Sequence, residues 1–244
     1  LCPRLRAVET GLNLKSEEAM KQKFSTSLMG MDLMHAADQI TALNDYTALF
    51  HVDIIDWHYA KNMCLFPDFI RQLAPYAKKP IDVHMMVDGP EYEIAQACIA
   101  AGADIFSFQA DAVEKNVFKY IELVKKNGKK FGVVLNPATP LSQIEAYLDQ
   151  VDLLTFMGVT PGFAGQKLAP VVLEKIRQAI ALREADGLHF ETQIDGGCHA
   201  NTMKAIHETG IDYIVLGNTF LFSHSADIHE AWPKMELEFA KCIC

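Results

Sequence analysis

The chain has 244 residues, of which 50% are hydrophobic and 22% are charged, and its formal net charge at pH 7 is −9. This composition supplies a packed core and excludes an intrinsically disordered protein. The acidic balance, with no long run of Lys or Arg, excludes the basic surface that nucleic acid or an anionic membrane requires. Pro, Gly and Asn interrupt the longest uncharged segments before they reach the length of a bilayer span, so we expect no membrane segment.

Six cysteines are dispersed along the chain without a CxxC pair. In a chain of this length such sparse cysteines are typical of reduced thiols, which predicts a cytoplasmic protein. The first residues lack the apolar core of a signal peptide. We therefore interpret residues 1–21 as an N-terminal appendage that need not be native, with Met20 as the natural start, and expect one domain over residues 22–244.

Eight short runs rich in β-branched or aromatic residues are predicted strands. In chain order they cover residues 24–28, 49–55, 80–87, 104–108, 131–135, 153–157, 192–196 and 213–217. Segments with helical periodicity lie between them, for example 92–103 and 117–130, and in the second we expect Phe118 on the buried face with Ile121. Strands that alternate with helices at this spacing favour the α/β class and a single (β/α)8 TIM barrel. An open doubly wound sheet is the alternative, but it would normally carry a GxGxxG motif after the first strand, and none occurs there.

In a barrel of this kind the chemistry takes place where strands end and the following loops begin. The polar residues near the predicted strand ends are Ser27, His51, Asp53, Asp56, His84, Gln109, Asn136, Thr160 and Asp195. His51 and Asp53 lie two residues apart on one strand, so their side chains point to the same side of the sheet. His84 and Asp195 occupy equivalent depths on the third and seventh strands, and we expect all four side chains to converge on the barrel axis.

Two imidazoles and two carboxylates at one place predict a cage for a divalent metal ion. Burying two carboxylates without a cation is costly, and an ion is the simplest compensation. Mixed nitrogen and oxygen ligands suit Zn, Fe, Mn or Co better than Mg or Ca. The alternative is that each residue is a structural hydrogen-bonding group. For Asp56 and Asp82, capping or a salt bridge is an equally good explanation.

Glycine-rich turns follow the last three predicted strands, with the sequences PGFAGQ (161–166), DGG (195–197) and LGNT (216–219). Glycine lets backbone N–H groups approach an anion closely, and helix N-termini add a favourable dipole, so a phosphate can be held without Lys or Arg. Barrels commonly bind phosphate at this place, although each turn taken alone is explained as an ordinary turn. Cys198 and His199 follow DGG, but adjacent residues do not readily form a nucleophile and its base, so we assign them to a helix start.

Seven motifs, in order and one per strand, resemble those of the ribulose-phosphate 3-epimerases and their relatives, the allulose-6-phosphate 3-epimerases. They are STSLMGMDL, HVDIIDWHY, DVHMMV, LNPATPLS, MGVTPGFAGQ, QIDGG and the turn at Gly217. The resemblance runs from about Phe24 to the C-terminal region. It implies a TIM barrel of the ribulose-phosphate-binding type and one divalent metal ion. The ligands that it implies are His51, Asp53, His84 and Asp195.

The same resemblance implies that Asp53 and Asp195 form the catalytic acid–base pair and that Ser27 contacts the substrate near the metal. The other expected substrate-binding residues are Met86, Met157, Gly162, Gly165, Gly196, Gly197, Gly217 and Asn218. The two methionines either fill core gaps or form a polarizable lid over a reactive intermediate. We expect no organic cofactor, and a small phosphorylated ketose as the partner, and leave a homo-oligomer open.

The chain departs from the family pattern at six positions, which are Ile55, Trp57, Ala60, Lys61, Gln109 and Thr160. Trp57 would favour a shorter sugar if its ring entered the pocket. The segment 221–232 is closer to the allulose-phosphate relatives, whereas LNPATPLS is closer to the pentulose enzymes. We predict a metal-dependent 3-epimerase of ribulose 5-phosphate and xylulose 5-phosphate that transfers protons between two carboxylates through an enediolate. The alternatives are an allulose-6-phosphate 3-epimerase and a non-catalytic sugar-phosphate-binding barrel.

Overall fold

The computed structural model describes residues 22–89 and 91–244. Within these residues, parallel strands close into a barrel in sequence order. The strands are β1 (Lys23–Ser27), β2 (Leu49–Ile55), β3 (Ile81–Met86), β4 (Ile105–Gln109), β5 (Lys130–Leu135), β6 (Leu153–Met157), β7 (Glu191–Asp195) and β8 (Tyr213–Leu216). The predicted (β/α)8 TIM barrel is therefore confirmed. The predicted appendage at 1–21 and the start at Met20 lie outside the described residues, so the division into domains stays a prediction.

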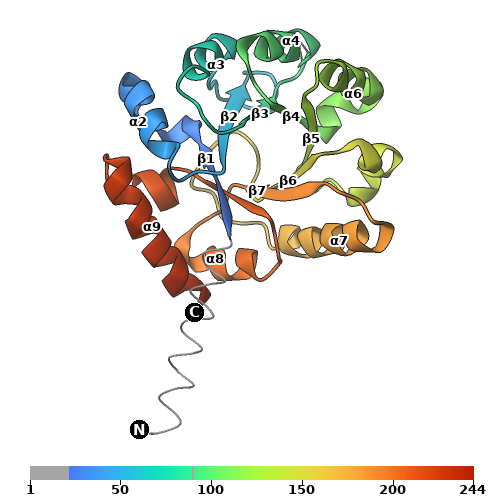
Figure 1. Cartoon of the computed structure of the whole chain (residues 1–244). Coiled ribbons are helices and arrows are strands. Elements are labelled where there is room, and N and C mark those ends of the chain that lie inside the picture. The colour runs from blue at the N-terminus through green and yellow to red at the C-terminus, as the bar shows by residue number, and fades with distance from the viewer. Residues whose placement is uncertain (1–21, 90) are drawn as a thin grey trace, which may run out of the picture.

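Helices form a ring outside the strands (Figure 1). The α-helices are α2 (Ala36–Leu43), α3 (Pro67–Leu73), α4 (Glu91–Ala101), α5 (Ala110–Val113), α6 (Val117–Lys126), α7 (Val171–Asp186), α8 (Ala200–His207) and α9 (Ile228–Ile243). Short 3-10 helices are η1 (Leu28–Gly30), η2 (Leu33–His35), η3 (Glu114–Asn116) and η4 (Leu141–Gln150), and η5 (Asn218–Phe222) is a π-helix. In the part of the chain that is described, none of these helices combines the length and the apolar character that crossing a membrane demands.

Helix α6 buries Ile121, as predicted, but not Phe118, and it ends before residue 130. The chain leaves the helix before Gly128, which adopts a φ of 69° that favours glycine. The expectation that Phe118 is buried was wrong, because its side chain is 58% exposed. The helical period places Val117 and Ile121 on the buried stripe and turns Phe118 to one side of it.

Side chains along each strand point alternately outward, toward the helices, and inward, into the barrel. On β2, Phe50, Val52 and Ile54 belong to the main core, which lies between the strands and the helices. Inside the barrel, strands β2, β4, β6 and β8 contribute one apolar layer, formed by Leu49, Ile105, Leu153 and Tyr213. Layers from alternate strands fill the interior of a TIM barrel. Toward the carboxyl ends of the strands the interior becomes polar, and this polar part contains the candidate site.

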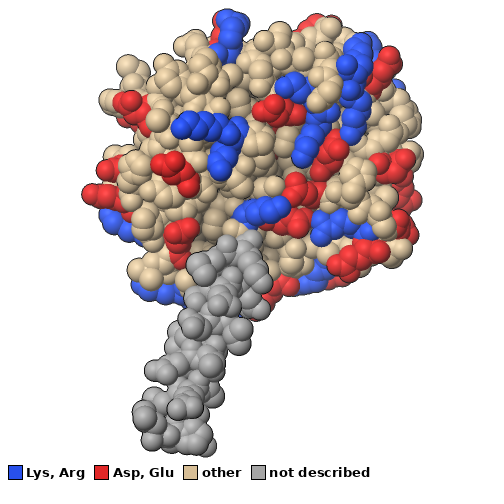
Figure 2. Space-filling view, viewed as in Figure 1, with Lys and Arg blue, Asp and Glu red and all other residues tan. Residues whose placement is uncertain are grey.

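The first strand closes the barrel, and the last helix packs against that strand. β1 pairs with β2 on one side and with β8 on the other, and α9 lies beside α2 and α8 (Figure 1). Phe24 of β1 meets the rings of Trp232 and Phe239 edge to face, with centroids 6.2 and 5.1 Å apart. Acidic and basic side chains are interspersed over the face shown in Figure 2.

Candidate active site

Four side chains meet inside the barrel near the carboxyl ends of the strands. His51 and Asp53 extend from β2, His84 from β3 and Asp195 from the end of β7. The register of β2 and β3 places Asp53 beside His84, whereas β7 lies across the barrel from β3. The structure thus brings together the four side chains that the sequence predicts to converge.

One atom of each side chain faces a common point. His51 Nε2 lies 3.3 Å from Asp53 Oδ1 and 3.7 Å from Asp195 Oδ2. His84 Nδ1 lies 3.3 Å from Asp53 Oδ1, 3.4 Å from Asp195 Oδ2 and 3.2 Å from His51 Nε2. Tetrahedral ligands bonded to one zinc ion at about 2.0–2.2 Å are about 3.3–3.6 Å apart. Separations of 3.2–3.7 Å are close to this range, and all four ligand atoms lie within 4.8 Å of one another. The donor set is therefore of a kind and size that could hold a divalent transition-metal ion, and we call these four residues the metal cage.

The buried carboxylate of Asp82 contacts His51, one of the residues of the metal cage. Asp82 Oδ2 lies 2.9 Å from His51 Nδ1 and accepts a hydrogen bond of 3.0 Å from Gln193 Nε2. Asp82 Oδ1 accepts a 2.6 Å hydrogen bond from Ser107 Oγ, and a Cβ at Gly132 would come within 2.4 Å of that hydroxyl. A carboxylate on the outer nitrogen fixes the orientation of a metal-binding histidine. Of the two explanations offered for Asp82, a salt bridge with His51 is the one observed.

The sequence interpretation gave Asp82 only a capping or salt-bridge role and left Gln193 unassigned, although a signal for both residues exists. Asp82 lies two residues before His84, and Gln193 lies two residues before Asp195. The period-two rule therefore places them on the inner face, one layer deeper in the barrel.

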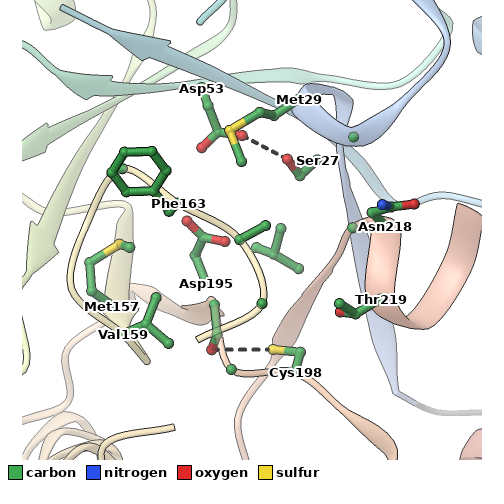
Figure 3. A pocket seen from close by; sticks show the side chains of 18 of the residues that line it. Ser27, Met29, Asp53, Met157, Val159, Phe163, Asp195, Cys198, Asn218 and Thr219 are labelled. Atoms are coloured by element: carbon green, nitrogen blue, oxygen red, sulfur yellow. Dashed lines mark hydrogen bonds between the residues drawn. The ribbon is translucent and has the colours of Figure 1, made fainter. Parts of the chain in front are cut away.

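The two carboxylates reach the same space from different strands (Figure 3). Asp53 uses Oδ1 in the metal cage, and its Oδ2 accepts a 2.7 Å hydrogen bond from Ser27 Oγ. Asp195 points into the space from the opposite side, with Met157 and Phe163 nearby. This arrangement can hold an ion and place two proton-transferring groups around one bound molecule.

Charges within the cage shift each other's pKa. Burial lowers the pKa of His51, but the attraction of Asp53 and hydrogen bonds to carboxylates outweigh burial and raise this pKa well above its usual value. Burial also opposes the rise in the pKa of His84, which comes from hydrogen bonds to Asp195 and Asp53. Burial raises the carboxyl pKa of Asp53 and of Asp195, but the imidazoles outweigh it and lower both. Imidazole protons thus balance the carboxylates, and a divalent ion would replace those protons.

A pocket opens above the metal cage. Eleven predicted site residues line it, namely Ser27, Asp53, Met86, Met157, Gly162, Gly165, Asp195, Gly196, Gly197, Gly217 and Asn218. His51 and His84 are fully buried beneath it. Met29, Val159 and Phe163 add apolar surface that no sequence pattern indicated. No Lys or Arg is among the described lining residues, so an anion here would depend on backbone N–H groups, helix termini and other polar side chains.

Glycines allow the loops around the pocket to approach one another. Gly158 N donates a 2.7 Å hydrogen bond to Asp195 O, and a Cβ at Gly158 would lie 2.0 Å from Gly196 O. Asn62 Nδ2 donates a 2.7 Å hydrogen bond to Gly162 O, which joins the loop after β2 to the loop after β6. The loop that follows Asp195 is therefore held against the loop that follows β6.

Several other candidates lie outside the described lining of the pocket. Asp56 Oδ1 accepts hydrogen bonds from the backbone nitrogens of His58 and Tyr59, so its role is capping. Asn136 Nδ2 donates to Tyr59 Oη at 2.8 Å. Trp57 is 55% exposed and Thr160 is also exposed. The Trp57 ring does not narrow the pocket, so its bulk does not favour a shorter sugar.

Cys198 and His199 lie immediately before α8, at the predicted helix start. His199 is the residue that precedes the helix, and its backbone nitrogen donates a 2.9 Å hydrogen bond to Thr202 Oγ1. Cys198 Sγ donates to Gly196 O at 3.7 Å. Burial raises the pKa of the Cys198 thiol, so this thiol stays protonated and is a poor nucleophile.

Comparison with known proteins agrees with this geometry. Residues 23–221 match the model of the ribulose-phosphate 3 epimerase family. The chain is 36% identical over 228 residues to ribulose-phosphate 3-epimerase 1 of Cupriavidus necator, which covers 91% of this chain and 93% of that protein. It is 35% identical over 205 residues to ribulose-phosphate 3-epimerase of Escherichia coli strain K12, with 84% and 89% covered.

Solved structures support the same fold. KGPDC from Streptococcus mutans, in a ligand complex, has a TM-score of 0.66 at 15% identity and covers 91% of this chain and 98% of its own. 3-Hexulose-6-phosphate synthase from Salmonella typhimurium has a TM-score of 0.61 at 18% identity, with 91% and 100% covered. At such identities the likeness concerns the barrel alone. The match to the family model and the identity to the curated relatives show more: the chain belongs to the ribulose-phosphate 3-epimerase family, whose class of enzyme is the isomerases.

Proposed function

We propose that this chain interconverts ribulose 5-phosphate and xylulose 5-phosphate by inverting the configuration at C3. The observation that carries the proposal is that Asp53 and Asp195 face one space from different strands while both reach a single metal-sized cage. The names of the curated relatives support the pentulose phosphate as substrate. No organic cofactor enters the proposal.

Inversion next to a carbonyl group requires a proton to leave one face of C3 and another to arrive at the opposite face. In the proposed mechanism one of the two carboxylates removes the first proton, and the other, protonated beforehand, supplies the second. Ser27 donates to Asp53 Oδ2 and so keeps this carboxylate turned toward the pocket. The enzyme ends each turnover with the protonation states of Asp53 and Asp195 exchanged, which suits a reversible reaction.

The metal cage completes the proposed chemistry. His51, Asp53, His84 and Asp195 would hold one divalent ion, with Zn, Fe, Mn and Co as the candidates for mixed nitrogen and oxygen ligands. When bound, such an ion acts as a Lewis acid that stabilises negative charge developing on the C2 and C3 oxygens of the substrate. The carboxylates also need this positive charge, since both are largely buried.

The phosphate group would lie at the opposite end of the pocket, against the turns after β7 and β8. Gly196, Gly197, Gly217 and Asn218 line this end, and a Cβ built at Gly217 meets no atom within 4 Å. The open space leaves the backbone accessible to an anion. Met86 and Met157 would cover the reacting carbons with apolar, polarizable surface.

A second candidate is epimerisation of allulose 6-phosphate, which the resemblance of segment 221–232 favours. The two substrates present the same carbonyl and hydroxyl to the cage and differ in the distance from C3 to the phosphate. Comparing kcat/KM for the two compounds decides between them, and a tenfold preference for allulose 6-phosphate, about 1.4 kcal/mol, overturns the pentulose assignment. The proposal places the reaction in the cytoplasm, consistent with dispersed cysteines.

The experiment that tests the epimerase activity itself is exchange of the C3 proton of ribulose 5-phosphate in heavy water, with and without a chelator. We expect deuterium at C3 together with xylulose 5-phosphate, and loss of both when the metal is removed. Binding of the sugar phosphate without exchange, in protein shown to contain metal, would identify a non-catalytic binding barrel instead.

A further inference from the structure

Gln109 contacts a ligand of the metal cage and leaves a polar atom unpaired. It ends β4 and is fully buried. Its Nε2 lies 2.8 Å from Nε2 of His84, the ring nitrogen on the far side from the cage. The amide oxygen Oε1 is buried and has no hydrogen-bond partner within the described residues. Buried amide oxygens are rarely left unpaired, so this atom requires an explanation.

The two histidines of the cage have different partners on their outer nitrogens. His51 Nδ1 faces Asp82, whose carboxylate accepts hydrogen bonds when ionised. His84 Nε2 faces Gln109, whose amide contains one acceptor and one donor group. Only the hydrogen bond between His84 and Gln109 can therefore form in two ways, with the amide as donor or as acceptor.

The state of His84 that binds a metal ion decides which arrangement is required. A neutral imidazole carries one N–H, and Nδ1 must offer its lone pair to the ion, so the proton resides on Nε2. That N–H would then face the NH₂ of Gln109, which is also a donor. Rotation of the Gln109 amide by half a turn brings Oε1 to His84 Nε2 and moves the NH₂ to the position of Oε1. The N–H of His84 and the unpaired oxygen then satisfy each other.

We infer that Gln109 is a positioning residue that accepts a hydrogen bond from His84 Nε2–H through Oε1 and so keeps the Nδ1 lone pair directed at the metal cage. The inference rests on the metal cage of the proposed function and is independent of which sugar phosphate is the substrate. Partners on the outer nitrogen fix the tautomer and ring orientation of metal-binding histidines, and their loss weakens metal binding.

Zinc affinity of two Gln109 variants separates an acceptor role from a donor role. Gln109→Met keeps the length of the side chain but cannot accept, and it should weaken Zn²⁺ binding about 10- to 100-fold. Gln109→Glu can only accept when ionised, and it should bind Zn²⁺ at least as tightly as the unmodified chain. Both affinities are measured by competition with a chromogenic chelator. If Gln109 acted as a donor, both variants would lose affinity, and that result overturns the inference.

A matched control comes from a buried amide far from the cage. Asn44 is 5% exposed, donates to Tyr76 O at 2.8 Å and accepts from Lys78 N at 2.7 Å. Asn44→Leu should lower the melting temperature but leave Zn²⁺ affinity unchanged. If Gln109→Met changes stability alone, in the manner of Asn44→Leu, the residue is merely structural and the inference is wrong.

Nuclear magnetic resonance of the zinc-loaded, ¹⁵N-labelled protein reports the tautomer directly. We expect the imidazole proton of His84 on Nε2, and faster exchange of that proton with water in Gln109→Met. A proton on Nδ1 in the zinc-loaded protein overturns the inference.

If the unmodified chain and His84→Ala bind Zn²⁺ equally, the metal cage itself is wrong, and the inference fails with it. If the unmodified chain and Gln109→Met bind Zn²⁺ equally, the inference about Gln109 is wrong, but the metal cage is not contradicted.

Discussion

Asp53 gives its two carboxylate oxygens different partners. Oδ1 faces the imidazoles of His51 and His84, while Oδ2 accepts from Ser27. Asp195 offers Oδ2 to the same two imidazoles. A carboxylate used both as a ligand and as a proton-transferring group makes the Asn substitution informative, because Asn has a similar shape but neither carries charge nor binds the transferred proton.

Asp53→Asn and Asp195→Asn should each reduce kcat for epimerisation about 10²- to 10⁴-fold, the usual contribution of a general acid or base. Binding of the phosphorylated ketose should remain measurable, since the proposed phosphate contacts lie at Gly197 and Gly217. Steady-state kinetics and calorimetric binding check the two expectations, with the metal content of each variant determined alongside. Near-normal turnover by either variant contradicts the two-carboxylate assignment.

Gly217→Ala tests the phosphate end of the pocket. The residue has φ −127°, which any amino acid adopts, and a Cβ there meets no atom within 4 Å. The variant should therefore fold normally while its methyl group occupies space next to the backbone that receives the phosphate. We expect KM to rise about tenfold, equivalent to about 1.4 kcal/mol, with little change in melting temperature. An unchanged KM would move the phosphate away from this turn.

At the scale of elements, the alternation of side chains along the strands makes most of the site predictable from sequence. It places His51 and Asp53 on one side of β2, and the strand-end rule adds His84 and Asp195. The same alternation extends to Asp82, which lies one layer below His84 and contacts His51. Side-chain positions on the strands are predictable because apolar and inward-facing polar residues both follow the two-residue repeat of a β-strand.

Contacts that depend on strand register, side-chain rotamers or loop conformation could not be predicted in this way. The distance between Gln109 and His84 depends on the register of β3 and β4 and on the rotamers of both side chains. Phe163 and Trp57 belong to loops, and no periodicity indicates that the first lines the pocket while the second does not. Loop conformation depends on such contacts as the hydrogen bond from Asn62 to Gly162, which joins residues far apart in the sequence.

Gly158→Ala tests the close approach of the loops after β6 and β7. Its Cβ would lie 2.0 Å from Gly196 O, a backbone atom that cannot rotate away. The loop that carries Gly196 and follows Asp195 must shift, so we expect a loss of about 1–3 kcal/mol in the free energy of unfolding and weaker metal binding. Denaturant unfolding and zinc titration measure the two effects. Gly217→Ala adds the same methyl group without a clash and is the matched control; equal stability of the two variants contradicts the packing argument.

At the scale of the whole molecule, the metal cage joins parts of the barrel that do not pair with each other. β2 and β3 are neighbours, but β7 lies across the barrel from β3. An ion bound to His84 and Asp195 therefore links opposite walls, and the link exists only in the folded chain. Binding free energy of such an ion adds to the free energy of unfolding.

Metal loading should raise the melting temperature, and the rise should grow with pH. In the metal-free protein the pKa values of His51 and His84 lie above 6.5. The protonated imidazoles therefore stabilise the folded metal-free protein fully below about pH 6.5. This stabilisation is lost as pH rises through the pKa values that they have in the folded state. Zn²⁺ requires both imidazoles without their cage-facing protons, so it competes with protons at pH 6 and less so at pH 8.

The size of the effect follows from mass action. Free Zn²⁺ at 100 times its Kd contributes about 2.7 kcal/mol, which for a chain of this length corresponds to about 5–11 °C. Thermal scans at pH 6, 7 and 8, with Zn²⁺ or with a chelator, measure the difference, and His84→Ala serves as the control in which it should be much smaller. A difference that shrinks as pH rises would contradict the proton–metal competition, because a lower proton concentration can only favour the ion at a site whose imidazoles are otherwise protonated.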